Sequence, residues 1–145
     1  MRLRRVKNAS EIINKSEYYI PSPELYKGKW DEVFGNNNPI YIEIGMGKGH
    51  FINESALKYP NINFIGIEKQ ESVLAKAVSR ITIKDLPNLK YICLDAIKID
   101  TVFDKEIDLI YLNFSDPWPK ERHAKRRLTS DIFLPLYDKI FNDNN

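Results

Sequence analysis

The stretch Tyr41-Ile42-Glu43-Ile44-Gly45-Met46-Gly47-Lys48-Gly49-His50 decides the fold of this chain. The apolar run over 40–44 predicts a buried strand, and an amphipathic run over 51–59 predicts a helix. Between them stand three alternating glycines, Gly45, Gly47 and Gly49. A strand, a glycine turn and a helix in this order make room for a cofactor in open α/β folds. Glycine suits the turn because it accepts unusual dihedral angles and leaves the backbone open to a ligand. Glycine turns also connect the strand and helix of ordinary βα units that bind no cofactor, so both interpretations of this stretch stay open at this point.

The alternation of strand and helix continues to the end of the chain. The apolar runs predict strands over 40–44, 64–67, 91–94 and 109–114. The amphipathic runs predict helices over 49–59, 71–83 and 130–141. Such alternation implies right-handed crossovers and a parallel sheet covered on both faces. We therefore predict an α/β fold with a Rossmann-like, mostly parallel sheet. We expect this sheet to be truncated after the helix that follows the fourth strand.

The chain divides into two regions by pattern. Residues 1–38 have only short helical stretches, over 10–16 and 29–35, and we interpret them as an N-terminal arm or lid. Residues 39–145 carry the regular alternation and are predicted to form the Rossmann-like domain.

Bulk composition is that of a soluble globular chain. Of 145 residues, 43% are hydrophobic and 29% are charged, which is ordinary for one domain. No apolar run approaches the ~20 residues that span a membrane, so no membrane partner is predicted. Cys93 is the only cysteine and lies in an apolar run. It predicts no internal disulfide and fits the reducing cytoplasm.

Positive charge is concentrated in two stretches, 1–7 and 120–127. Together they hold nine of the 22 basic residues and one of the 20 acidic residues, so the rest of the chain has a net charge of −6. Basic blocks on an acidic body attract polyanions.

Acidic residues fall at the ends of all four predicted strands: Glu43, Glu68, Asp95 and Asp116. The carboxyl edge of a parallel sheet is where ligands bind in open α/β folds. One such acid is often only the N-cap of the next helix, but four in four strands favour a binding site.

The spacing of these acids favours S-adenosylmethionine over a nicotinamide cofactor. Glu68 suits a ribose diol, which both molecules have. The alternate glycines after Glu43 differ from the G-x-G-x-x-G pattern that holds a pyrophosphate. An acid this close to the first glycine would repel a pyrophosphate but accept from the ammonium of a methionine moiety. Asp95 is placed to accept from an adenine amino group.

The fourth strand runs into Asp116-Pro117-Trp118-Pro119-Lys120, and a basic run over 121–127 follows at once. An acid and an aromatic ring at a stiff turn suit recognition of a flat base, although a packed structural turn would look the same. The basic run suits salt-dependent contacts to a nucleic-acid backbone.

These motifs together resemble the bacterial tRNA (guanine-N7-)-methyltransferases. The resemblance rests on residues 42–49, 66–68, 116–120 and 122–128, with 26–35 also fitting. It implies a class I methyltransferase fold and methyl transfer from S-adenosylmethionine to N7 of the variable-loop guanine, tRNA position 46. The family continues past this chain, with further strands and a motif that helps hold the guanine.

The resemblance also implies roles for single residues. The positions implied to bind the methyl donor, S-adenosylmethionine, are those of Glu43, Glu68, Asp95 and Asp116. The implied loop around this donor contains Gly45, Gly47 and Gly49. Asp116 is also the implied catalytic residue. The implied tRNA contacts are Lys120, Arg122, His123, Lys125, Arg126 and Arg127.

Two other functions stay open from the sequence. One is a nicotinamide-dependent oxidoreductase, which leaves the basic run without a role. The other is a non-catalytic RNA-binding protein. His50 and His123 have no cluster of ligands around them, so no metal is predicted, and a monomer and a homodimer are equally compatible with the sequence.

Overall fold

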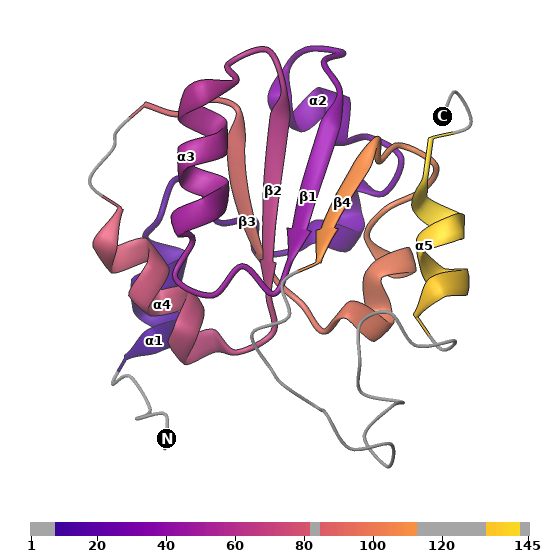
Figure 1. Ribbon diagram of the computed structural model, residues 1–145. Helices are drawn as coiled ribbons and strands as arrows, with labels where there is room; N and C mark the ends of the chain where they lie inside the picture. The colour runs from indigo at the N-terminus through magenta and orange to yellow at the C-terminus, as the bar shows by residue number, and fades with distance from the viewer. Residues whose placement is uncertain (1–7, 82–84, 113–132, 143–145) are drawn as a thin grey trace.

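The computed structural model describes residues 8–81, 85–112 and 133–142, and its centre is a four-stranded parallel sheet (Figure 1). The strands are β1 (Ile40–Ile44), β2 (Asn63–Glu68), β3 (Leu89–Cys93) and β4 (Leu109–Leu112). Their spatial order is β3-β2-β1-β4, and every neighbouring pair is parallel. The predicted α/β fold with a parallel sheet is confirmed.

Helices cover both faces of this sheet. One face carries α1 (Ala9–Asn14), α3 (His50–Lys58) and α4 (Glu71–Arg80), whose apolar side chains share one core cluster with β2 and β3. The other face carries α2 (Trp30–Phe34), the 3-10 helix η2 (Ala96–Thr101) and α5 (Leu134–Ile140). A second 3-10 helix, η1 (Pro23–Tyr26), precedes α2. Two-sided cover explains why the central strands are apolar without alternation.

The described part of the predicted N-terminal arm, residues 8–38, packs onto the sheet. Trp30 is fully buried, and its indole N–H donates to the Val102 carbonyl at 2.7 Å. Earlier in the sequence, residues 18–20 pair with β3. The Tyr91 N–H donates to the Tyr18 carbonyl at 2.8 Å, and the Ile20 N–H donates to the Tyr91 carbonyl at 3.0 Å. These bonds cover the outer edge of β3, which would otherwise expose unpaired backbone groups.

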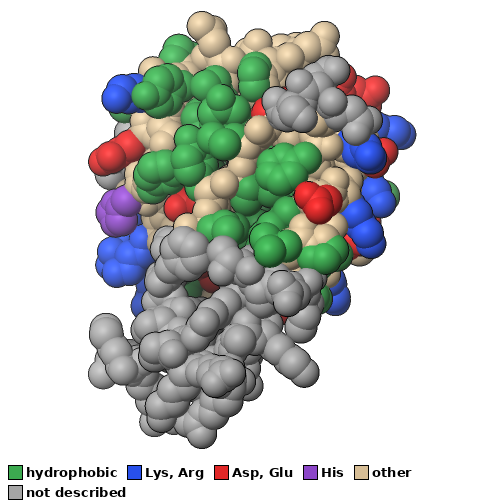
Figure 2. Space-filling view, turned by 45° about the vertical axis from the view of Figure 1, so that its right-hand side comes forward, with side chains coloured by type: hydrophobic (Ala, Val, Ile, Leu, Met, Phe, Trp, Pro, Cys, Tyr) green, Lys and Arg blue, Asp and Glu red, His purple; other side chains and the backbone are tan. Residues whose placement is uncertain are grey.

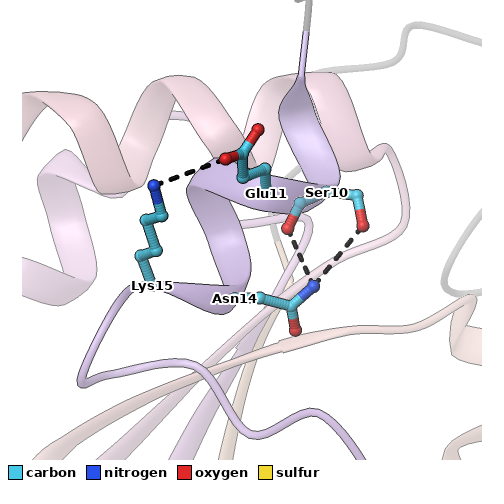
Figure 3. Close-up of polar contacts among 4 residues, drawn as sticks. All are labelled: Ser10, Glu11, Asn14 and Lys15. Atoms are coloured by element: carbon cyan, nitrogen blue, oxygen red, sulfur yellow. Dashed lines mark hydrogen bonds and ion pairs between the residues drawn. The ribbon is translucent and has the colours of Figure 1, made fainter.

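The outer side of α1 is held by local polar contacts (Figure 3). The Asn14 amide donates to the Ser10 carbonyl at 2.8 Å, and Lys15 pairs with Glu11 at 3.4 Å. Exposed pairs at this spacing contribute only a few tenths of a kcal/mol, about 0.3–0.5. The position of α1 therefore depends on its packing against α4.

The predicted bounds differ from the observed ones mainly at element ends. β2 and β3 each include residues that we did not assign to strands, and α4 ends at Arg80. Residues 113–114 and 130–132 of the predicted fourth strand and last helix lie outside the described residues. Pro135 falls in the first turn of α5, where its missing N–H has no intrahelical partner to lose.

β4 is the less covered edge strand of the sheet. Just before β4, the Ile107 N–H donates to the Ile140 carbonyl at 2.9 Å, which places the end of α5 beside the start of β4. On the α3 face, Phe51 and Leu109 are 47% and 37% exposed, and the Phe51 ring lies 4.9 Å from the Tyr111 ring. Figure 2 shows hydrophobic side chains spread over this side of the molecule.

Within the described residues, no helix combines the length and the hydrophobicity needed to cross a membrane.

Candidate functional site

The four parallel strands point the same way, so their carboxyl ends meet at one edge, the lower edge in Figure 1. The predicted site residues that the structure describes come from the ends of β1, β2 and β3 and from the loop after β1. They are Glu43, Gly45, Gly47, Gly49, Glu68 and Asp95.

The glycine loop has a backbone that only glycine adopts without strain. Gly45, Gly47 and Gly49 have φ of 79°, 58° and 82°. The N–H groups of Gly45 and Met46 donate to the Ile67 carbonyl at 2.9 and 3.0 Å, which fastens the loop to the end of β2. A Cβ on Gly47 would meet nothing within 4 Å, so the backbone there is open to an approaching ligand.

Glu68 joins the loop after β1 to the start of α4. One carboxylate oxygen accepts from the Gly47 N–H at 3.1 Å, and the other accepts from the Gln70 N–H at 2.9 Å. The side chain is only 8% exposed. A carboxylate has about four lone-pair sites and accepts from N–H groups and from hydroxyl groups such as those of a ribose.

Glu43 lies one strand away and is only 4% exposed. Its Oε1 has no hydrogen-bond partner. Burial, with a smaller effect of the Glu68 carboxylate, raises the pKa of Glu43 to about 7. A buried carboxylate without a donor is costly, so this group is available to a ligand that brings a donor or a positive charge.

Neighbouring strands explain why Glu43 is buried. The register places Glu43 beside Gly66 on β2 and Tyr111 on β4, and paired residues share a face of the sheet. A Cβ on Gly66 would lie 2.5 Å from the Met46 sulfur, so the Met46 side chain lies over the bare backbone of Gly66. Sequence reasoning missed Met46 and Gly66. The available signal was a glycine inside an apolar strand, which often marks close approach.

A second contact supports the loop from beneath. The Tyr91 hydroxyl on β3 donates a short hydrogen bond to the Asn53 side-chain oxygen on α3. The same Asn53 side chain lies 3.3 Å from where a Cβ on Gly49 would be. Burial raises the pKa of Tyr91 above its usual range, so the hydroxyl stays protonated as the donor.

Asp95 caps η2, because its carboxylate accepts from the Ile97 N–H at 3.1 Å. The residue is exposed at the same edge as Glu68. Its second oxygen and remaining lone pairs leave it able to accept from a ligand.

The other predicted site residues lie outside the described residues. They are Asp116, Lys120, Arg122, His123, Lys125, Arg126 and Arg127. Among 8–81, 85–112 and 133–142, no group of three or more His, Cys, Asp or Glu side chains could hold a metal ion.

Two buried carboxylates at an open glycine loop define a site for a ligand with positive charge and hydroxyl groups. A pyrophosphate would bring negative charge beside the Glu68 carboxylate at low dielectric, where repulsion is strong. The fold and the site thus define a Rossmann-like domain with a site suited to a cationic, ribose-containing cofactor.

Comparison with known proteins agrees with this class. Residues 37–144 match the family described as "Putative methyltransferase". The chain is 54% identical to the tRNA (guanine-N(7)-)-methyltransferase of Streptococcus mutans, over 97% of this chain and 67% of that protein. It is 55% identical to the protein of the same name from Lachnoclostridium phytofermentans, over 97% and 66% respectively. The chain belongs to the tRNA (guanine-N(7)-)-methyltransferase family, and the resemblance found in its motifs is confirmed.

The chain spans about two thirds of the length of these curated relatives. Among solved structures, the aminoglycoside resistance methyltransferase NpmB1 aligns with a TM-score of 0.62 and 22% identity. That alignment covers 79% of this chain and 56% of the other. At this identity the likeness concerns the fold alone.

Proposed function

We propose that this chain binds S-adenosylmethionine and serves methyl transfer to N7 of a guanine in tRNA, at position 46 of the variable loop. The observation that carries the proposal is the pair of buried carboxylates, Glu43 and Glu68, at the glycine loop of a chain from this family. When bound, S-adenosylmethionine would supply the methyl group on a positively charged sulfur.

Each donor-site residue has a role that follows from its surroundings. Glu43 has an unpartnered oxygen for the ammonium of the methionine moiety. Glu68 accepts from the Gly47 and Gln70 N–H groups, and its carboxylate accepts from the ribose hydroxyls. Asp95 accepts from the adenine amino group. The open backbone at Gly47 lets the ligand approach closely.

Methyl transfer mainly requires that guanine N7, the methyl group and the sulfur of the methyl donor lie in line. Guanine N7 has an in-plane lone pair that is free at neutral pH, so no general base is needed. Holding the reacting groups in line contributes up to roughly 7–11 kcal/mol. We assign to Asp116 the role of stabilising the positive charge that develops on the base, or of fixing its N1–H and amino group.

We assign the basic run over 122–127 and Lys120 to the tRNA. Arg and Lys side chains there would contact phosphates without reading sequence. We also assign the protein to the cytoplasm, which agrees with a tRNA substrate and with the lone Cys93.

A tritiated-methyl assay on unmodified tRNA tests the proposal. It would compare this chain with a version extended by the matching C-terminal residues of the Streptococcus mutans relative. Label in the N7-methylguanosine fraction with either protein supports the proposal, and Asp116→Ala should remove it while weakening donor binding less. No label with either protein, or an unchanged single-turnover rate in Asp116→Ala, would contradict it.

Calorimetry separates the other two functions. Binding of S-adenosylhomocysteine but not NADH argues against an oxidoreductase. Binding of tRNA with a steep salt dependence, together with no binding of S-adenosylhomocysteine, would instead indicate a non-catalytic RNA-binding protein.

A further inference from the structure

Glu43 and Glu68 both lie in the proposed site for the methyl donor, but they differ in the hydrogen bonds that they accept from the protein. Glu68 accepts from two backbone N–H groups, at 3.1 and 2.9 Å. Glu43 is 4% exposed, and its Oε1 accepts from nothing. Two neighbouring acids in a poorly hydrated place do not both ionise easily. The hydrogen bonds favour the charged form of Glu68, so the proton belongs on Glu43.

The groups that face Glu43 give it no compensating charge. Glu68 faces it from the end of β2, Tyr111 pairs with it from β4, and Tyr41 precedes it on the same face of β1. From α3, the apolar Ile52 side chain lies next to Gly66, the residue paired with Glu43, and the Phe51 ring packs against Tyr111. In the described part of the chain, no lysine, arginine or histidine pairs with Glu43. Lys48 and His50, the nearest in sequence, are exposed.

We propose that Glu43 carries a proton in the ligand-free protein and that binding of the methyl donor through its ammonium group releases this proton. The inference rests on the proposed function of the site. The O–H bond of the Glu43 carboxyl breaks, the proton passes to the solvent, and the carboxylate left behind faces the ammonium. The site thereby gains one negative charge only when a positive charge arrives to balance it. The raised pKa of Glu43, about 7, agrees with this exchange.

Calorimetry in two buffers of different ionisation enthalpy measures the proton directly. S-adenosylhomocysteine is the probe, and the pH is kept between 6 and 7, where the α-amino group of the ligand is already charged. We expect release of most of one proton per bound ligand at pH 6 and of a smaller fraction at pH 7. Binding with the same enthalpy in both buffers at pH 6 would overturn the proposal.

A smaller ligand that lacks the ammonium group tests whether this group causes the proton release. 5′-Methylthioadenosine keeps the adenosine part but lacks the amino-acid part of the donor. It should bind more weakly and release no proton. Equal release with 5′-methylthioadenosine would show that the ammonium does not drive the exchange, and this too would overturn the proposal.

Matched variants assign the proton to its residue. Glu43→Gln should bind S-adenosylhomocysteine without proton release. Glu54→Gln makes the same chemical change at an exposed position of α3 and should keep the release. Release that persists in Glu43→Gln would overturn the assignment.

A carboxyl NMR titration of the ligand-free parent protein, labelled with ¹³C-glutamate, measures the proton on Glu43 without a bound ligand. One glutamate should titrate near pH 7, and Glu68→Gln should move its midpoint downward. All glutamates titrating between about 4 and 5 would overturn the proposal. Absence of any donor binding, with one glutamate still titrating near 7, would instead refute the proposed function and with it the release step.

Discussion

Glu68 accepts a hydrogen bond from the backbone N–H of Gly47 at 3.1 Å, and so joins the end of β2 to the loop after β1. Its other oxygen accepts from the Gln70 N–H at the start of α4. One side chain therefore fixes the relative position of two segments that follow neighbouring strands. An acid that would be expected only to bind ligand also builds the site in which the ligand lies.

Glu68→Gln is expected to weaken S-adenosylhomocysteine binding by about 10- to 100-fold, because hydrogen bonds to a charged group contribute about 1.5–3 kcal/mol. The amide keeps one acceptor and loses the charge. Calorimetry measures the affinity. Glu71→Gln, at an exposed position three residues on, is the control and should bind within a factor of about two. Equal losses in both variants would contradict a specific role for Glu68.

Gly66→Ala is expected to lower the free energy of unfolding by about 1–3 kcal/mol through overpacking. The new Cβ would lie 2.5 Å from the Met46 sulfur and 3.3 Å from a Tyr91 ring carbon. Urea unfolding measures the cost. Combining it with Met46→Ala should cost less than the two single changes together, since the clash is then gone. Strict additivity would show that Met46 does not lie over Gly66.

Trp30→Phe is expected to destabilise the protein by about 2–4 kcal/mol, through lost volume and an unpaired buried carbonyl. The Trp30 indole N–H donates to the Val102 carbonyl at 2.7 Å, and its ring packs 5.4 Å from that of Phe103. Tyr26→Phe, at a ring 37% exposed, should change stability by less than about 0.5 kcal/mol. If Trp30→Phe were equally mild, residues 8–38 would behave as a detachable lid.

Glu43→Gln is expected to stabilise the ligand-free protein at high pH. Because the folded-state pKa of Glu43 lies above its unfolded value, the folded protein binds the proton more tightly. That stability is present below pH 4.5 and is lost as the pH rises through 7. The variant should match the parent near pH 4 and exceed it by up to about 3 kcal/mol at pH 8. Urea unfolding across this range tests it, with Glu54→Gln following the parent. Parallel curves for Glu43→Gln and the parent would contradict a raised pKa.

Arg126→Ala is expected to weaken tRNA binding and to reduce the slope of log K against log salt by about one. The loss should be similar for different tRNAs, because a phosphate contact reads no sequence. Filter binding at several salt concentrations measures both quantities. Lys15→Ala removes the same charge from α1, where Lys15 pairs with Glu11, and should leave the slope unchanged. An unchanged slope in Arg126→Ala would place the tRNA elsewhere.

Sequence pattern predicted the elements well where local signals are strong. The apolar run over 40–44 is β1, and the helical stretch predicted over 29–35 contains α2, which ends at Gly35 in a left-handed conformation. The bounds of β2 and β3 differ from the predicted ones, because pairing with a neighbour decides where a strand begins and ends. The roles assigned to Glu43, Glu68, Asp95 and Asp116 as ligand-binding residues stay predictions.

The sequence by itself determined the class of fold, the family and the identity of the acids at the carboxyl edge. These follow from period, glycine spacing and local motifs, which depend on residues close together in the chain. Only the tertiary structure decided that Glu68 has two backbone donors and Glu43 has none at Oε1. That difference depends on the register of β1 against β2 and on Met46 lying over Gly66. The two glutamates look alike in the sequence, and their different surroundings in the folded chain give them different chemistry.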